Sequence, residues 1–242
     1  MGLQRPQRPR RPQRPQRTLA WMKDGTERLL ADLAGLPDEA LTAPTALPGW
    51  TRRHLLAHLA ANAGALRNLV YWARTGEERR MYASQQQRDA DIAAGAERPA
   101  GELRAWVESS AAALAADLDS LPGPAWEATV ITAQGVTRTA EQIPWMRVRE
   151  VYVHAVDLAA GTAFADLPAD FLAALLDDVT ARRSARGGPA LAVAASDTGG
   201  RWEVAGPGAP VRVTAPLAAL AAWLTGRPAP SLANAPVLPP WL

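Results

Sequence analysis

The stretch LPGWTRRHLLAHLAANAGAL, residues 47–66, has the pattern of an amphipathic helix. Its apolar side chains recur at the spacing of one face of an α-helix, as Leu55, Leu59, Leu66 and, just beyond the stretch, Leu69. Thr51 stands directly before this run and has a side chain suited to capping a helix N-terminus. The pattern therefore predicts a helix that begins at about Thr51 and continues to about Arg74.

Two histidines on this helix, His54 and His58, are spaced four residues apart. At about 100° per residue, His58 and Asn62 fall inside the apolar stripe, whereas His54 lies near its edge. His54 also belongs to the first turn of the helix, where a side chain is more often exposed. We therefore expect His58 to face the core and His54 to face away from it.

The segment VREVYVHAVDL, residues 148–158, places further polar side chains on a largely apolar helix. Glu150 and His154 lie one turn apart on one face, and burying them is costly unless they are paired or bind a metal. Two side chains at this spacing can converge on one ion, and a third ligand from a facing helix completes a site of two histidines and a carboxylate. This argument selects His58, Glu150 and His154 as metal ligands.

Ordinary structural roles stay open for the same residues. A Glu–His pair at this spacing is often a surface contact, and an inward histidine is more often a hydrogen-bonded core residue than a ligand. Arg147 and Glu150, three residues apart, could form a simple ion pair. Asp157, one turn beyond His154, either orients that ring or lies on the surface.

The remaining periodic segments define the architecture. In the first part of the chain, helices are predicted over residues 18–33, 51–74, 100–121 and 140–160. After Gly161 the pattern predicts a helix over 168–183, strands over 191–195, 201–204 and 211–214, and a helix over 217–224. Residues 75–99 are too weakly periodic for a prediction, and residues 126–139 read as an extended connection. The sequence thus indicates an α+β protein, with a four-helix bundle over 18–162 and a small mixed α/β domain over 163–242.

Residues 1–17 differ from the rest of the chain. They hold six arginines, four prolines and no acidic residue, a composition typical of a disordered tail. Because removing six positive charges changes the net charge from +2 to −4, we do not expect the body to bind nucleic acid. The tail itself could be a nucleic-acid-binding arm, but it has no aromatic side chain for stacking, and we interpret it as a dispensable extension.

The composition also excludes several classes of protein. Hydrophobic residues make up 48% of the 242, which is enough for a sizeable core, and no apolar run is long enough to span a membrane. The N-terminus lacks the apolar segment of a signal peptide, so we expect a cytoplasmic protein, either a monomer or a weak homodimer. The chain has no cysteine, which excludes disulfides and a thiol nucleophile of its own, and its single lysine, Lys23, leaves little scope for Schiff-base chemistry.

The two histidine-bearing motifs, residues 47–66 and REVYVHAVDL at 149–158, resemble those of the DinB-like metal-binding helical bundles. Three further stretches resemble the mycothiol-dependent maleylpyruvate isomerases: WARTGEERRMYASQQQRDADIAAGA at 72–96, AAWLTGR at 221–227 and LPPWL at 238–242. The resemblance extends over residues 18–242. It implies a DinB-like four-helix bundle followed by a small α/β C-terminal domain, with zinc or another divalent metal bound by His58, Glu150 and His154.

The resemblance further implies the cosubstrate and the reaction. An essential arginine of the family falls on Arg227, which would reach toward the metal. Tyr82 and Gln86 would line the mouth of the site and contact the cosubstrate. The activity implied is the cis–trans isomerisation of maleylpyruvate to fumarylpyruvate, a step of gentisate degradation. Mycothiol would supply the thiolate, which adds to the double bond and leaves after rotation. The alternatives are a mycothiol S-transferase that conjugates the thiol to another electrophile, and a DinB-like binding module without enzymatic activity.

Overall fold

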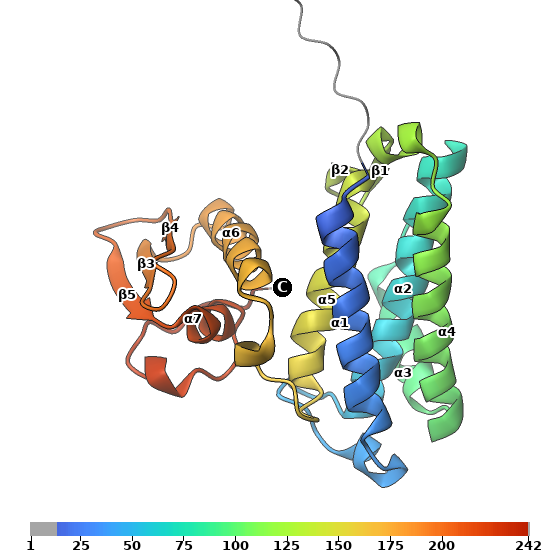
Figure 1. Cartoon of the computed structure of the whole chain (residues 1–242), viewed down its shortest axis with the longest axis horizontal. Coiled ribbons are helices and arrows are strands. Elements are labelled where there is room, and N and C mark those ends of the chain that lie inside the picture. Colours follow the sequence, from blue (N-terminus) through green and yellow to red (C-terminus); the bar gives the residue numbers. More distant parts are fainter. Residues whose placement is uncertain (1–13, 242) are drawn as a thin grey trace, which may run out of the picture. The chain divides into compact units, whose positions relative to one another are not determined.

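The structure of the chain is a computed structural model that describes residues 14–241, and it divides into two compact units, Met1–His154 and Ala155–Leu242 (Figure 1). The predicted tail lies outside the described residues except for positions 14–17, of which Gln16 and Arg17 already belong to the first helix. Across the described part of the chain, no helix has both the length and the apolar character needed to cross a membrane.

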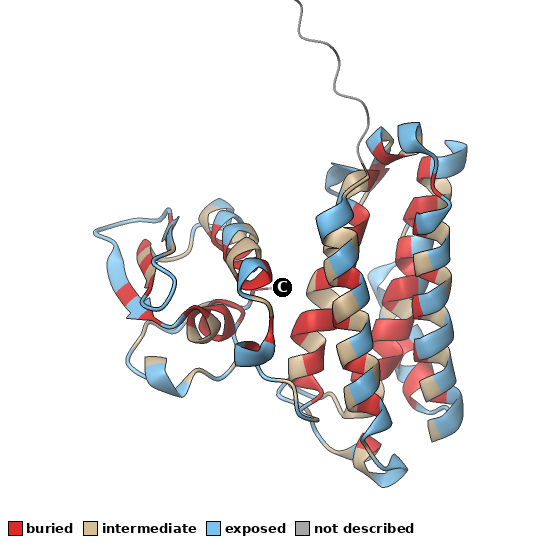
Figure 2. Cartoon of the chain, viewed as in Figure 1, coloured by how far each residue is buried: buried red, intermediate tan, exposed pale blue. Residues whose placement is uncertain are grey.

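The first unit is built from long helices around a central one. Its helices are α1 (Gln16–Ala34), α2 (Arg52–Thr75), α3 (Gln85–Ala96), α4 (Ala100–Asp119) and α5 (Ile143–Asp157), the last of which runs into the second unit. The central helix α2 packs against both α3 and α4. Its apolar stripe is fully buried, as Figure 2 shows for the inward sides of the helices, and includes Leu55, Leu59, Leu66 and Leu69.

The start of α2 explains why one of its two histidines is not in the core. Thr51 is the N-cap of the helix, as predicted. The side chain of His54 folds back onto this cap, because its Nδ1 lies 2.8 Å from the Thr51 hydroxyl and 3.4 Å from the Thr51 backbone nitrogen. His54 is therefore used at the helix terminus, while His58, one turn later, is buried. The prediction that His58 faces the core and His54 does not is confirmed.

The helix α3 was not predicted, because it buries few side chains. Only Ile92, Gly95 and Ala96 are buried along its length, so it lacks a regular apolar stripe. The sequence does contain a start signal, since the hydroxyl of Ser84 accepts a hydrogen bond from the Gln87 backbone N–H at 3.0 Å. A serine followed three residues later by glutamine is a helix-start pattern that periodicity alone does not detect.

The helix over residues 140–160 is shorter at both ends than predicted. Residues 140–142 form a turn of 3-10 helix, and α5 starts at Ile143, directly before a proline, which is tolerated in the first turn. At the other end the backbone of Ala159 is left-handed, with φ of 51°, which stops the helix. The predicted extended connection before α5 is a hairpin of β1 (Thr129–Ile131) and β2 (Thr137–Thr139).

Gly95 fixes how closely α3 approaches the rest of the unit. A Cβ at this position would lie 2.7 Å from Trp106 Cζ3 and 3.0 Å from Ala57 Cβ on α2. We expect Gly95→Ala to destabilise the protein by about 1–3 kcal/mol, since overpacking outweighs the gain of up to about 1 kcal/mol in helix propensity. Gly64→Ala on α2 is the matched control, because nothing lies within 4 Å of its added Cβ, and it should be neutral or stabilising. Chemical unfolding measures both; equal effects would contradict the packing argument.

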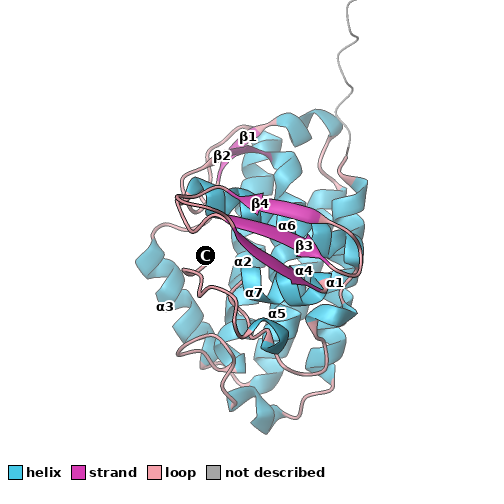
Figure 3. Cartoon of the chain, turned by 90° about the vertical axis from the view of Figure 1, so that its left-hand side faces the viewer, coloured by secondary structure: helices cyan, strands magenta, loops and turns pink. Residues whose placement is uncertain are grey.

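The second unit is a small α/β domain. It contains α6 (Ala169–Ala185), β3 (Leu191–Ala195), β4 (Arg201–Val204), β5 (Val211–Ala215) and α7 (Leu217–Leu224). The sheet has the order β4-β3-β5, with β4 antiparallel and β5 parallel to β3 (Figure 3). Alternate residues of β3 are buried, and both α6 and α7 pack against the strands. A helical N-terminal unit followed by an α/β unit confirms the predicted fold class, and every predicted element of the second unit is present.

Candidate metal centre

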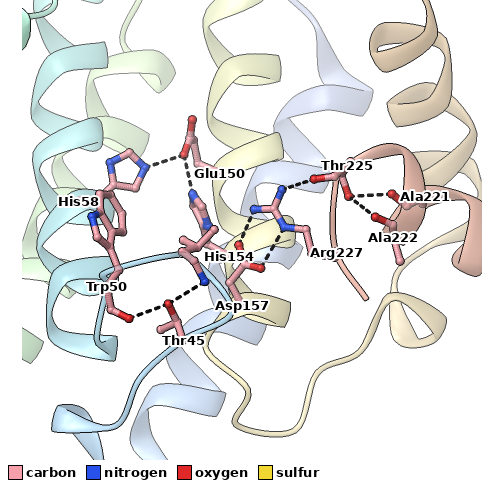
Figure 4. Close-up of polar contacts among 11 residues, drawn as sticks. Thr45, Trp50, His58, Glu150, His154, Asp157, Ala221, Ala222, Thr225 and Arg227 are labelled. Atoms are coloured by element: carbon pink, nitrogen blue, oxygen red, sulfur yellow. Dashed lines mark hydrogen bonds and ion pairs between the residues drawn. The ribbon is translucent and has the colours of Figure 1, made fainter. Parts of the chain in front are cut away.

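The structure brings His58 of α2 together with Glu150 and His154 of α5 in the first unit (Figure 4). One carboxylate oxygen, Glu150 Oε2, lies 2.9 Å from His58 Nε2 and 3.2 Å from His154 Nε2. The two imidazole rings meet edge to face, with their centroids 5.1 Å apart. Among the described residues, these three form the group of histidine and acidic side chains whose potential ligand atoms lie within 4.8 Å of one another.

The protonation states of the cluster suit a cation. Burial would raise the pKa of Glu150, but the hydrogen bonds and charges of the two histidines outweigh it and hold that pKa well below its usual range. Burial lowers the pKa of His58, and the Glu150 carboxylate only partly offsets this. At neutral pH the site therefore presents an ionised carboxylate and a neutral His58 ring, which are the forms that bind a metal.

The spacing of the ligand atoms also fits a metal. With bonds of about 2.0–2.1 Å, neighbouring ligands of a tetrahedral zinc ion are about 3.3 Å apart. The separations of 2.9 and 3.2 Å from Glu150 Oε2 to the two ring nitrogens need little adjustment to meet that geometry. Three protein ligands leave a fourth position for a small molecule. The residues present are thus compatible with a catalytic type of site.

The loop before α2 supports the His58 ring. The indole of Trp50 packs against that ring with centroids 5.4 Å apart. Trp50 is held in turn by its backbone, because its carbonyl accepts hydrogen bonds from both the backbone N–H and the hydroxyl of Thr45, each at 2.9 Å (Figure 4). Trp50 belongs to the stretch 47–66 that predicted α2, but its contact with His58 is tertiary and was not predicted.

Arg88 of α3 was also missed, although it lies directly beside the cluster. Its Nη2 is 3.3 Å from His58 Nδ1, and its guanidinium lies 5.8 Å from the centre of the Tyr82 ring. A guanidinium only donates hydrogen bonds, so His58 Nδ1 accepts here and the proton on Nε2 points at Glu150. No sequence signal identified Arg88, because α3 itself was not predicted.

The two residues expected at the mouth of the site differ in position. Tyr82 is half-buried near the cluster, where burial and the charge of Glu150 raise the pKa of its hydroxyl. It also lines a cavity of about 380 Å³ between α2, α3 and α4, together with polar and aromatic side chains that include Asn68, Asp91 and Trp106. Gln86 is exposed in the first turn of α3 and does not line this cavity.

Arg147 does not form the simple ion pair with Glu150 that the sequence allowed. Its side chain is 1% exposed, and Nη1 donates to the Leu59 carbonyl at 2.7 Å and to Asn62 Oδ1 at 2.9 Å. The reason is the packing of α5 against α2, which offers the carbonyl of Leu59, the residue after His58, and the side chain of Asn62, one turn beyond His58. Burial lowers the pKa of Arg147 to about 10, which leaves it charged at neutral pH.

Arg227 belongs to the second unit, where it forms a paired contact with Asp157 (Figure 4). Nε donates to Asp157 Oδ1 at 3.0 Å and Nη2 to Oδ2 at 2.6 Å, while Nη1 donates to the Thr225 carbonyl at 2.7 Å. The side chains are 12% and 1% exposed, respectively. Asp157 is thus buried, which contradicts the surface alternative, and its two oxygens hold the arginine.

Comparisons with known proteins give the family of this chain. The family descriptions "Mycothiol maleylpyruvate isomerase N-terminal domain" and "MDMPI C-terminal domain" match residues 22–159 and 166–238. Comparison with curated proteins gives no match. Among solved structures, the chain is similar to a crystal structure of the mycothiol-dependent maleylpyruvate isomerase at 35% identity and a TM-score of 0.90, over 94% of this chain and 97% of that one. A histidine-to-alanine mutant of the mycothiol-dependent maleylpyruvate isomerase is similar at 34% identity and a TM-score of 0.89, with the same coverage. With both halves of the chain matched in order and the solved structures covered almost end to end, this protein belongs to the mycothiol maleylpyruvate isomerase family.

Proposed function

We propose that this chain catalyses the mycothiol-dependent isomerisation of maleylpyruvate to fumarylpyruvate, with a divalent metal, zinc, bound by His58, Glu150 and His154. The observation that carries the proposal is the convergence of these three side chains in a member of the isomerase family. When bound, the metal would lower the pKa of a thiol and supply thiolate at neutral pH.

The absence of cysteine from the chain requires the thiol to come from outside. In the proposed reaction the thiolate sulfur bonds to one carbon of the conjugated double bond, and the electron pair of that bond moves into the neighbouring carbonyl as an enolate. The remaining carbon–carbon single bond rotates. The enolate then restores the double bond as the carbon–sulfur bond breaks, so the thiolate is released unchanged and no oxidant or reductant is consumed.

The chain's own residues would bind and orient the reactants. The cavity beside Tyr82 has a polar lining, which suits the body of a hydrophilic thiol cosubstrate. Arg227 would hold a substrate carboxylate. Its guanidinium has five N–H donors, of which three are used by Asp157 and Thr225, so two remain for a ligand.

The test combines metal analysis with an absorbance assay on maleylpyruvate. We expect the purified protein to contain about one zinc per chain and to isomerise maleylpyruvate only when mycothiol is added. His58→Ala should lose the metal and the activity together. His54→Ala is the matched control, because this histidine lies on the same helix but outside the cluster, and it should keep both.

The same assay separates the alternatives. An isomerase leaves the concentration of free thiol unchanged over many turnovers, whereas an S-transferase consumes one thiol for each product formed. Protein that is active without added thiol would contradict the cosubstrate proposal. Protein that binds zinc through His58 but never isomerises maleylpyruvate would retain the metal site and lose the assigned reaction.

A further inference from the structure

Arg147 carries a buried charge that the first unit does not neutralise. Nη1 makes both of its hydrogen bonds, to Leu59 and Asn62, while Nη2 is buried without a hydrogen-bond partner. Among the described residues, no carboxylate lies within ion-pairing distance of this guanidinium. A buried cation with an unbonded N–H is costly for stability, and a bound anion nearby would offset that cost.

Arg88 brings a second guanidinium to the same place. The guanidinium of Arg88 lies 5.8 Å from the centre of the Tyr82 ring, and the charges of both arginines oppose the rise that burial causes in the pKa of the Tyr82 hydroxyl. Both also lie beside the metal cluster, since Arg88 contacts His58 at 3.3 Å and Arg147 donates to Asn62, one turn beyond His58 on α2. The side chain of Arg88 is 21% exposed, which makes it the member of the pair that a ligand can reach.

The contact between Arg88 and His58 holds only while the ring nitrogen Nδ1 can accept a hydrogen bond. A metal at Nε2 would replace the proton there, and Nδ1 would then carry the ring N–H. Two donors would face each other, so the guanidinium of Arg88 would need a new acceptor. The other terminal nitrogen, Arg88 Nη1, already pairs with the exposed carboxylate of Asp89 at 2.9 Å, so the unmet donor is Nη2, which faces His58. In the buried part of the site, two guanidinium groups and a divalent metal would face the one carboxylate of Glu150, and an anionic substrate would offset this excess of positive charge.

We infer that Arg88 and Arg147 form a carboxylate subsite of this centre that selects dicarboxylate substrates over monocarboxylates. Arg88 contacts the substrate carboxylate, and Arg147 supports it as a second positive charge, buried beside the metal cluster. The inference rests on the proposed function and adds to it the group on the first unit that recognises the second charge of the substrate. It is independent of Arg227, which belongs to the other unit.

Calorimetric titration of the zinc-loaded protein tests this without thiol or turnover. The probes are maleate and crotonate, four-carbon unsaturated acids with two carboxylates and one. We expect wild type to prefer maleate by about 10-fold or more, and Arg88→Met to lose about 10-fold to 100-fold in maleate affinity, as for a charge-assisted hydrogen bond. Arg88→Lys should retain part of the preference. Arg79→Met is the matched control, since Arg79 stacks on Tyr71 away from the cluster.

The outcomes are distinct for the two proposals. Three results would overturn the subsite: wild type binds maleate and crotonate equally, Arg88→Met keeps the preference for maleate, or Arg88→Met loses zinc. Arg147→Met should weaken maleate binding in the same direction, but because it can impair folding, the decision rests on Arg88. Protein that binds maleate through Arg88 yet does not isomerise maleylpyruvate would refute the proposed function alone. An active isomerase whose Arg88→Met variant keeps its maleate affinity would refute the subsite alone.

Discussion

Replacing Glu150 with glutamine is expected to remove the metal and to lower isomerisation on the order of 1,000-fold. Substitutions that only disturb the partners of metal ligands cost about 10-fold to 100-fold, so loss of a charged ligand should exceed that. Glutamine keeps the size of the side chain but has no negative charge. The two ring nitrogens at 2.9 and 3.2 Å would then face a neutral amide, which is a poor zinc ligand.

Zinc content by mass spectrometry and initial rates on maleylpyruvate measure this effect. Glu108→Gln on α4 is the control, because this exposed glutamate changes in the same way without contact with the cluster. Its zinc content and rate should match those of wild type. A Glu150→Gln protein with full zinc and an unchanged rate would show that the carboxylate is not a ligand. The cluster would then be an ordinary buried hydrogen-bonded group.

Helix-face arguments predicted the parts of the site that depend on local periodicity. His58 and His54 differ by one helical turn, and the position of the apolar stripe was enough to separate an inward from an outward ring. The convergence of His58 with Glu150 and His154 followed from the same reasoning, because α2 and α5 each have one apolar side and these sides must pack together. The periodicity of a helix indicates which of its side chains face the core, and this criterion selected His58, Glu150 and His154.

Contacts between elements could not be predicted in this way. Arg88 lies on a helix whose few buried residues gave no periodic signal, so its position beside His58 was invisible in the sequence. The ion pair with Glu150 that the spacing of Arg147 allowed does not form, because the Leu59 carbonyl and the Asn62 side chain of α2 supply the acceptors. Asp157 had two equally open interpretations until its partner, seventy residues away, was known. Local spacing does not determine which element lies opposite a side chain.

The pair formed by Arg227 and Asp157 gives the second large expectation, on stability. We expect Asp157→Asn to destabilise the second unit by about 3 kcal/mol or more, because it leaves the guanidinium of a buried pair without its counter-charge. Arg227→Met should cost a similar amount by leaving the carboxylate unpaired. Chemical unfolding, followed by the fluorescence of the tryptophans in this unit, measures both effects.

The double variant decides whether the two residues act as one unit. If the carboxylate serves mainly to hold the arginine, combining Asp157→Asn with Arg227→Met should cost less than the sum of the single changes, with a coupling energy of about 1–3 kcal/mol. Additive costs would contradict a direct pair. Activity adds a second criterion, because Arg227→Met removes the proposed carboxylate donor outright, whereas Asp157→Asn only loosens it. Asp157→Asn should therefore raise KM for maleylpyruvate while the zinc content stays unchanged. A loss of zinc in that variant would instead show that Asp157 orients the His154 ring.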